Sequence, residues 1–295
     1  MTLTFYYDSL GAMLDVVEAT PHQLDIIDGQ VFTRYIPRGA TGSTSTSTRF
    51  YGRHLFQMLE DCRAMLPFAE AISDIETMAH ELTVCLPPPR SVKRRRVQAE
   101  AGDHPDTDRM LRGDLAHAWV TTRKLLHDDP TALTTIILPV AYASITSEAS
   151  IYWNMAATLA LAWLLEDSGR RTCLVSLEYH TLSGVSPTTE FSSVTILKAH
   201  EAPWSLQEAI VTTDRAYLRR LIFRLQDCLP EPPDLGYGYV PSRGALQEHI
   251  AWCSQEYDWR HVITGAHPQH DDISERSSAL RWIERQIKSL EAVAL

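Results

Sequence analysis

The densest group of side chains that could do chemistry lies near the middle of the chain. It is an acidic cluster with one imidazole, made up of Asp103, His104, Asp106 and Asp108. Carboxylate oxygens bind hard divalent cations, and a histidine can add a nitrogen ligand. Together with Arg94 and Arg96, these residues suggest one hypothesis, a metal-dependent hydrolase that acts on nucleotides or nucleic acid.

Two plainer interpretations of the same cluster stay open. Its spacing does not match the calcium-binding loop of an EF-hand, and a solvated turn explains the residues as well. Ion pairs with the basic run from Lys93 to Arg96 explain them too. We therefore expect no bound metal and no cofactor, and we treat the acidic cluster as an alternative site.

A second group of potential ligands follows near the C-terminus, in the segment His267-Pro-Gln-His270-Asp271-Asp272. Two histidines three residues apart, flanked by carboxylates, can chelate a metal. A helix is expected over residues 274–294, however, and Asp272 and Glu275 have the spacing of a capping box. We predict that Asp272 is the N-cap of this helix rather than a metal ligand.

Two adjacent cations, Arg219 and Arg220, lie among apolar residues on a helix expected over 215–225. A guanidinium group in such surroundings needs an ionic partner. We expect one of the two to pair with a carboxylate inside the protein. The other is then left for solvent or for a binding partner.

The clearest secondary-structure signal runs from Thr134 to Tyr179. Residues 134–140 and 172–179 are apolar and rich in β-branched side chains, as is typical of strands covered on both faces. Between them, residues 151–165 are apolar nearly all round, which indicates a buried helix. Strand, helix and strand together predict a right-handed unit with parallel strands. Further strands are expected over 191–198 and 261–264.

The loop after the first of these strands, residues 141–147, is where an open α/β sheet would bind a ligand. It contains no glycine, so it has neither of the phosphate-binding motifs and no nucleophile elbow. Ser147 is expected to cap the following helix, with Glu148 favourably placed in its first turn. The predicted partner-binding residues are Ser144, Thr146, Ser147 and Glu148.

The stretch from Ile136 to Ser147, with the helix and the strand that follow, resembles a von Willebrand factor A-type domain. In that fold a buried strand ends in D-x-S-x-S, which binds a divalent cation. Here the aspartate position falls on Tyr142 or on Val140, depending on which serine is matched to Ser144. The resemblance therefore implies the fold with a degenerate metal site. Relatives of this type often serve ATPases as adaptors.

The wider chain is similar to an uncharacterised protein family encoded mainly by phages of actinobacteria. The resemblance covers most of residues 49–228. Its features are Arg49-Phe-Tyr-Gly52, Arg94-Arg-Arg-Val97, Gly102-Asp-His-Pro-Asp106, Leu111-Arg-Gly113 and Ala216-Tyr-Leu-Arg-Arg-Leu-Ile-Phe223. It implies no established activity.

Linker-like segments and changes in composition along the chain predict four regions. Residues 1–38 form a small N-terminal α+β region of strand and loop, and the Ser/Thr-rich segment 39–48 is a flexible linker. Residues 49–90 are helical, and 91–295 hold the α/β domain, a three-layer sandwich with a mainly parallel sheet. Within it, residues 91–101 are expected to be extended and residues 116–126 helical, with Trp119 facing inward.

Composition narrows the class of protein. The formal net charge of −10 argues against general affinity for nucleic acid or for anionic membranes. The five cysteines are widely spaced, and the N-terminus lacks the features of a signal peptide, so we expect a cytoplasmic protein with reduced thiols. The most apolar segment, 151–165, is shorter than the roughly 20 residues that span a bilayer.

These observations favour a non-catalytic interaction or adaptor protein, phage-encoded by its resemblance. By analogy its partner is an AAA+ ATPase, bound through the loop that holds Ser144 and Ser147. The metal-dependent hydrolase remains one alternative. A structural component of the phage particle is the other.

Overall fold

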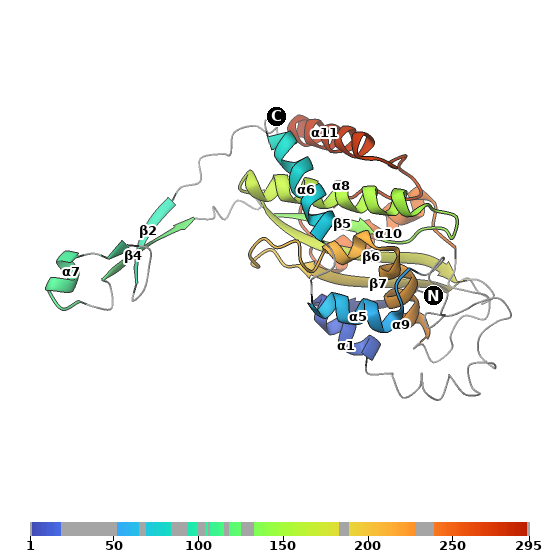
Figure 1. Cartoon of the computed structure of the whole chain (residues 1–295), viewed down its shortest axis with the longest axis horizontal. Helices are drawn as coiled ribbons and strands as arrows, with labels where there is room; N and C mark the ends of the chain where they lie inside the picture. Colours follow the sequence, from blue (N-terminus) through green and yellow to red (C-terminus); the bar gives the residue numbers. More distant parts are fainter. Residues whose placement is uncertain are drawn as a thin grey trace.

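The computed structural model describes residues 2–18, 52–64, 69–83, 94–99, 104–105, 107–114, 118–124, 133–182, 189–227 and 239–293. Figure 1 shows a sheet with helices packed on it. The described helices are α1 (Leu10–Glu18), α5 (Leu55–Ala64), α6 (Ala69–Leu82), α7 (Thr107–Leu111), α8 (Glu148–Asp167), η5 (Ile210–Thr213), η6 (Tyr217–Ile222), α9 (Phe223–Asp227), α10 (Arg243–Glu256) and α11 (Arg276–Val293).

The main sheet has five strands in the order β1-β7-β6-β5-β8. Their bounds are β1 (Thr2–Tyr7), β5 (Leu133–Pro139), β6 (Arg171–Leu182), β7 (Thr189–Lys198) and β8 (Ile263–Thr264). Neighbouring strands are parallel except for β6 and β7, which pair antiparallel. The predicted α/β class with a mainly parallel sheet is therefore confirmed, as is the parallel unit β5-α8-β6.

Helices cover both faces of this sheet because its central strands alternate between two cores. In β5, Ile136 and Leu138 join the larger core, with the helices α1, α5, α6, α8 and α11. Ile137 points the other way, into a smaller core under α10. Most residues of α8 are buried, as predicted from its apolar composition. Within the described ranges, no helix combines the length and apolar character needed to cross a bilayer.

The N-terminal strand belongs to the main sheet. β1 runs parallel to β7, with Thr2 opposite Glu190 and Tyr7 opposite Thr195. The helices α1, α5 and α6 share the larger core with α8. The expected N-terminal region (1–38) and helical region (49–90) thus contribute elements to the same core as the α/β region. The expected linker 39–48 lies outside the described residues.

A separate three-stranded sheet has the order β2-β4-β3, with β2 (Arg94–Ala99), β3 (His104–Pro105) and β4 (Trp119–Lys124). Figure 1 draws it apart from the main sheet. The predicted extended stretch at 91–101 is confirmed over Arg94–Ala99, whereas the helix predicted over 116–126 is wrong, because Trp119–Lys124 form a strand. Residues 120–122 are β-branched, and antiparallel pairing with β2 satisfies the backbone of β4. This non-local pairing outweighs the apolar spacing that suggested a helix.

Candidate functional site

The carboxyl edge of the main sheet is the place where α/β proteins usually bind ligands. β5 and β8 both end there, and the loops that follow them contact each other. The backbone N–H of Ala143, in the loop after β5, donates to Oε1 of Gln269 at 3.1 Å. Ser150 Oγ donates to the carbonyl of Pro268 at 3.1 Å. The loop after β8 therefore braces the loop that carries the predicted partner-binding residues.

The root of this loop is Tyr142, which is buried. Burial raises the pKa of its hydroxyl, which stays protonated and donates to the carbonyl of Arg215 at 2.9 Å. The guanidinium of Arg219 lies 5.3 Å from the centre of the Tyr142 ring. Arg219 Nη2 also donates to the carbonyl of Ser144 at 3.2 Å. A tyrosine and an arginine thus hold the root of the loop.

The predicted partner-binding residues lie on one turn beyond this root. The backbone N–H of Thr146 donates to the carbonyl of Ala143 at 3.1 Å. Ser147 is the N-cap of α8, as predicted, and its Oγ accepts from the N–H of Ser150 at 3.1 Å. Glu148 pairs with Arg215 at 3.3 Å. At the tip of the turn, Ile145 is 93% exposed.

The groups on this turn do not fit a divalent cation. Such a cation needs several oxygen ligands, charged ones above all. The Ser144 carbonyl already binds a guanidinium, the Ser147 hydroxyl oxygen accepts from the helix, and the Glu148 carboxylate is paired with an arginine. The guanidinium groups of Arg215 and Arg219 contact this turn, and their positive charges disfavour a cation there.

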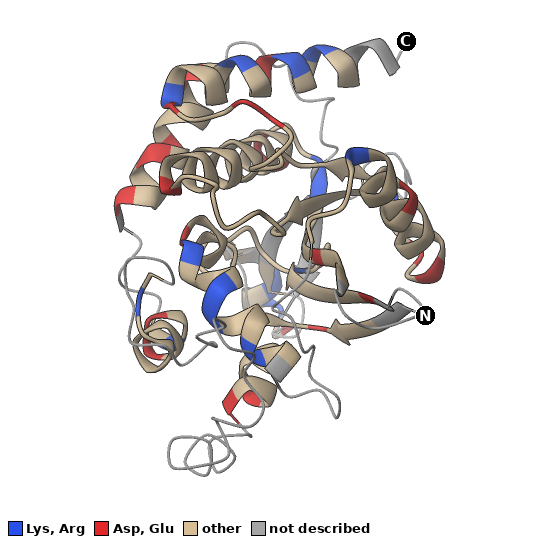
Figure 2. Ribbon diagram, turned by 90° about the vertical axis from the view of Figure 1, so that its right-hand side faces the viewer, with Lys and Arg blue, Asp and Glu red and all other residues tan. Residues whose placement is uncertain are grey.

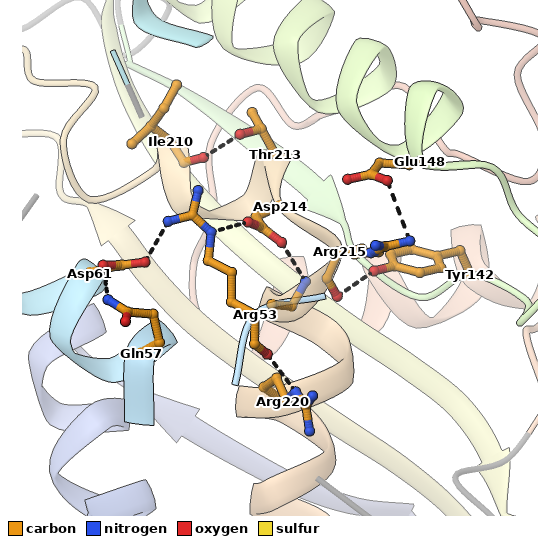
Figure 3. Close-up of polar contacts among 11 residues, drawn as sticks. Arg53, Gln57, Asp61, Tyr142, Glu148, Ile210, Thr213, Asp214, Arg215 and Arg220 are labelled. Atoms are coloured by element: carbon orange, nitrogen blue, oxygen red, sulfur yellow. Dashed lines mark hydrogen bonds and ion pairs between the residues drawn. The ribbon is translucent and has the colours of Figure 1, made fainter. Parts of the chain in front are cut away.

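A network of ion pairs connects α5 to the chain between η5 and η6 (Figure 3). Arg53 Nε donates to Asp214 Oδ2 at 2.8 Å, and Arg53 Nη1 forms an ion pair with Asp61. Asp214 Oδ1 accepts from the backbone N–H of Ala216 at 2.8 Å. Burial lowers the pKa of Arg53, but its hydrogen bonds and the two negative charges outweigh burial and raise the pKa overall. The network fixes the turn that precedes Arg215 and Arg219.

The helix η6 is a π-helix, a rare form that often marks functional sites. It carries Arg219 and Arg220, both of them buried. Arg219 reaches the loop after β5, whereas Arg220 Nε donates to the carbonyl of Arg53 at 2.7 Å. The expectation that one of these arginines is left for solvent is wrong, because the two side chains hold two different segments against the core.

Arg53 and Asp214 were not singled out from the sequence. They lie 161 residues apart, and no local pattern connects them. The one local signal is Gly52, part of the Arg49–Gly52 feature. It has a φ of +75°, and a Cβ there would lie 3.1 Å from Arg215 Cγ. Only a glycine combines that backbone conformation with so close a contact.

Sequence reasoning also missed a buried polar pair on β6. Glu178 Oε1 and His180 Nδ1 lie 2.7 Å apart, and the two side chains are each 3% exposed. Glu178 Oε2 and His180 Nε2 have no hydrogen-bond partner, and the same holds for Oγ of Ser193, which pairs with Glu178 across the sheet. The polar residues at 176, 178 and 180, alternating with apolar ones, were the available signal. Both side chains are buried, so neither is accessible from solvent.

The histidines after β8 form a structural turn. His267 stacks on His270 with ring centres 4.2 Å apart, and burial lowers the pKa of His267 to about 3. Asp271 Oδ2 accepts from the backbone N–H of His267 at 2.8 Å and its Oδ1 pairs with Arg243. Among the residues that the structure describes, no group of three or more His, Cys, Asp and Glu side chains is placed to hold a metal ion.

The N-cap predicted at Asp272 is wrong. α11 begins later, at Arg276, and the carbonyl of Glu275 accepts from the N–H of Ala279 at 3.1 Å. Ser278 Oγ accepts from the N–H groups of Ser274 and Glu275, both at 3.3 Å. A serine inside the helix therefore satisfies the donors for which the capping-box pattern had suggested Asp272.

The alternative acidic cluster lies largely beyond the described residues. Asp103 and Asp106 are outside them, and the structure describes His104 and Asp108 only through the backbone of β3 and α7. Arg94 and Arg96 are likewise described only as part of β2. β2 and β3 flank β4 in one sheet. The hydrolase hypothesis stays a prediction.

The sheet and its helices define the class of the protein, which is an α/β protein with a mainly parallel sheet flanked by helices. Within this class, the chain belongs to the family described as "Domain of unknown function (DUF7192)", whose family model matches residues 2–287. The comparison with curated proteins and the comparison with solved structures each gave no match.

Proposed function

We propose that this protein is a non-catalytic interaction protein that docks on a partner through the turn from Ala143 to Glu148, here called the edge turn. Its α/β domain is of the von Willebrand A type, with a degenerate metal site. Two observations support this kinship: the parallel unit β5-α8-β6, and the position of the edge turn directly after a buried strand. The partner, by analogy with other domains of this type, is an AAA+ ATPase.

The observation that carries the proposal is the contrast between the root and the tip of the edge turn. The root is held by Arg219 and Gln269, so the turn keeps one shape. At the tip, a large apolar side chain, Ile145, is 93% exposed between hydroxyl-bearing residues. A rigid segment loses little conformational entropy on binding, and an exposed apolar anchor gains from burial.

Because arginines rather than a metal ion hold the edge turn, chelators should affect partner binding differently here than in a cation-dependent domain. A cation-dependent domain of this type loses its partner when the cation is chelated. Here the turn is held by guanidinium groups, which stay protonated at all physiological pH values. The interaction we propose is therefore insensitive to chelators.

The test is affinity purification of the tagged full chain from its native cells or infected host, with mass spectrometry and light scattering on the eluate. We expect an AAA+ ATPase in fixed ratio, unaffected by EDTA. Ile145→Asp places a charge on the anchor and is expected to reduce the recovered ATPase at least tenfold. Leu111→Asp is the matched control, because Leu111 is 86% exposed on α7, away from the edge turn.

Either of two results would overturn the proposal. Recovery of no ATPase with the unaltered chain removes the partner class. Equal recovery with Ile145→Asp and with the unaltered chain removes the edge turn as the docking surface. A loss that also occurs with Leu111→Asp would show a general effect of added charge, and would count against the edge turn too.

A further inference from the structure

A chain of aromatic rings crosses from the edge strand β1 to the end of α10, on the face of the sheet opposite α8. Tyr6 of β1 stacks on Tyr257, with ring centres 4.7 Å apart. Tyr257 in turn meets Trp252 at 6.4 Å, edge to face, and Trp259 at 5.5 Å. We call these four residues the aromatic surface. Two of its residues are nearly half exposed to solvent: Tyr6 is 46% exposed and Trp252 is 44% exposed.

The exposed rings rest on a fixed foundation. Trp252 stacks on His249 with centres 5.4 Å apart, and His249 stacks on Tyr179 at 4.0 Å with an interplanar angle of 6°. His249 is buried and hydrogen-bonds Ser192 Oγ at 2.7 Å. Because this stack continues into the smaller core, the outer rings are already ordered, and a ligand that stacks on them has little side-chain entropy to remove.

Negative charge surrounds the aromatic surface. Glu248 and Glu256 are exposed on α10, whose one cation, Arg243, lies at the opposite, N-terminal end. Figure 2 shows this helix at the right, blue near its start and red toward its end. The helix C-terminus adds a partial negative charge of its own. Asp8 follows β1 and is exposed, while Asp258 is paired with Arg260 at 2.7 Å.

The charges of nearby carboxylates affect the pKa values of the two tyrosines of the aromatic surface. Burial raises the pKa of Tyr257, and the nearby charge of Glu256 raises it further. Burial likewise raises the pKa of Tyr6, and the charge of Asp8 adds to the effect. The carboxylates are thus close enough to act on a group that lies against the rings.

We propose that the aromatic surface, with Glu248 and Glu256, binds arginine side chains of a partner protein. A guanidinium group is planar, stacks on aromatic faces, and forms two parallel hydrogen bonds to a carboxylate. Exposed indole and phenol faces next to carboxylates offer both contacts at once. An anionic partner such as nucleic acid is disfavoured by the same charges. The proposal is independent of the edge turn, because the aromatic surface comes from β1, α10 and the residues just after α10, and shares no residue with that turn.

The probe is a labelled peptide of alternating arginine and glycine, titrated into the full chain and followed by fluorescence anisotropy at two salt concentrations. A lysine–glycine peptide keeps the charge without the planar group. A citrulline–glycine peptide keeps the planar shape without the charge. We expect the arginine peptide to bind, the lysine peptide to bind several-fold more weakly, and the citrulline peptide not to bind.

Paired variants locate the binding. Trp252→Ala removes an exposed ring, and Glu256→Gln removes one charge; each is expected to weaken arginine-peptide binding about fivefold, the size of an exposed cation–π contact or ion pair. The controls are Phe56→Ala and Glu60→Gln, on α5, because Phe56 is 65% exposed and Glu60 is exposed as well. Tyr6→Ser is a second aromatic variant and covers the case that Trp252→Ala does not fold.

Three outcomes would overturn the proposal. The first is no binding of the arginine peptide by the unaltered chain. The second is equal binding of the arginine and citrulline peptides, which would exclude a role for charge. The third is an equal loss in the α5 control variants, which would show that the net charge of the protein attracts the peptide without a defined site.

Discussion

Replacing Arg53 by methionine removes the centre of the ion-pair network while keeping a side chain of similar length. The change leaves Asp61 and Asp214 without their guanidinium partner, and both carboxylates are mostly buried, at 11% and 17% side-chain exposure. Breaking a buried ion pair by removing one partner costs about 3–5 kcal/mol. Arg53 is itself 33% exposed, so solvent screens part of the interaction. We therefore expect a loss of about 2–3 kcal/mol in the free energy of unfolding.

Arg63→Met, on the helix α5 that begins two residues after Arg53, is the matched control. Arg63 pairs with Asp15 at 2.6 Å and with Glu18 at 3.0 Å, but these carboxylates are 72% and 43% exposed. Exposed pairs of this kind contribute at most about 1 kcal/mol. Both variants are measured by guanidinium chloride unfolding, followed by circular dichroism and by tryptophan fluorescence.

A double-mutant cycle isolates the pairwise contribution. Asp214→Asn removes the charge but keeps an oxygen that can accept from the N–H of Ala216. Since Arg53 and Asp214 are in direct contact, we expect a coupling free energy of at least about 1 kcal/mol. The reasoning fails if Arg53→Met costs no more than Arg63→Met, or if the two changes at Arg53 and Asp214 are additive.

Two further predictions concern a histidine of α10 and a glycine that follows β8. Burial lowers the pKa of His249 to about 4 and that of His267 to about 3, against 6.5 for a free histidine, so the folded state holds both rings neutral. The contribution of the neutral rings to the free energy of unfolding is fully present above pH 6.5 and falls as the pH drops toward 4, by roughly 3 kcal/mol for His249 alone. His249→Gln should therefore make the fall in unfolding free energy over this range less steep, with the remaining slope due to His267, and an unchanged slope would contradict the assignment. Gly265→Ala would place a Cβ 2.5 Å from Thr158 Cγ2, so we expect a loss of more than about 2 kcal/mol in chemical denaturation. Gly244→Ala, whose Cβ meets nothing within 4 Å, should leave stability unchanged or higher.

The central unit of the fold could be predicted because its signals are local. Residues 134–140 are apolar and β-branched, and they form the buried strand β5. Ser147 caps α8 as expected, and Gly169, after the helix, has the left-handed φ of +86° that glycine adopts most easily. Each of these features depends on residues within one or two turns of each other, so the amino-acid pattern is enough to find it.

Pairings between distant residues could not be read in the same way. β1 joins the sheet beside β7, more than 180 residues away along the chain, and β4 is a strand because β2 lies next to it. The β-branched residues 120–122 favour a strand locally, but no local pattern identifies the partner strand, since backbone N–H and C=O groups are the same for every residue type except proline. The strand at β4, in place of the predicted helix, and the position of β1 in the main sheet could therefore be found only from the tertiary structure.

The candidate site also has one part that the sequence predicts and another that only the tertiary structure determines. The hydroxyl-bearing residues of the edge turn, Ser144, Thr146 and Ser147, were visible in the sequence. The contacts that hold the turn were not, because Arg219 comes from a helix 75 residues further on, and that helix is itself held in place through Arg53 and Asp214. The sequence shows that a residue is an arginine and therefore charged. The direction in which its side chain points depends on packing, which exists only once the chain has folded.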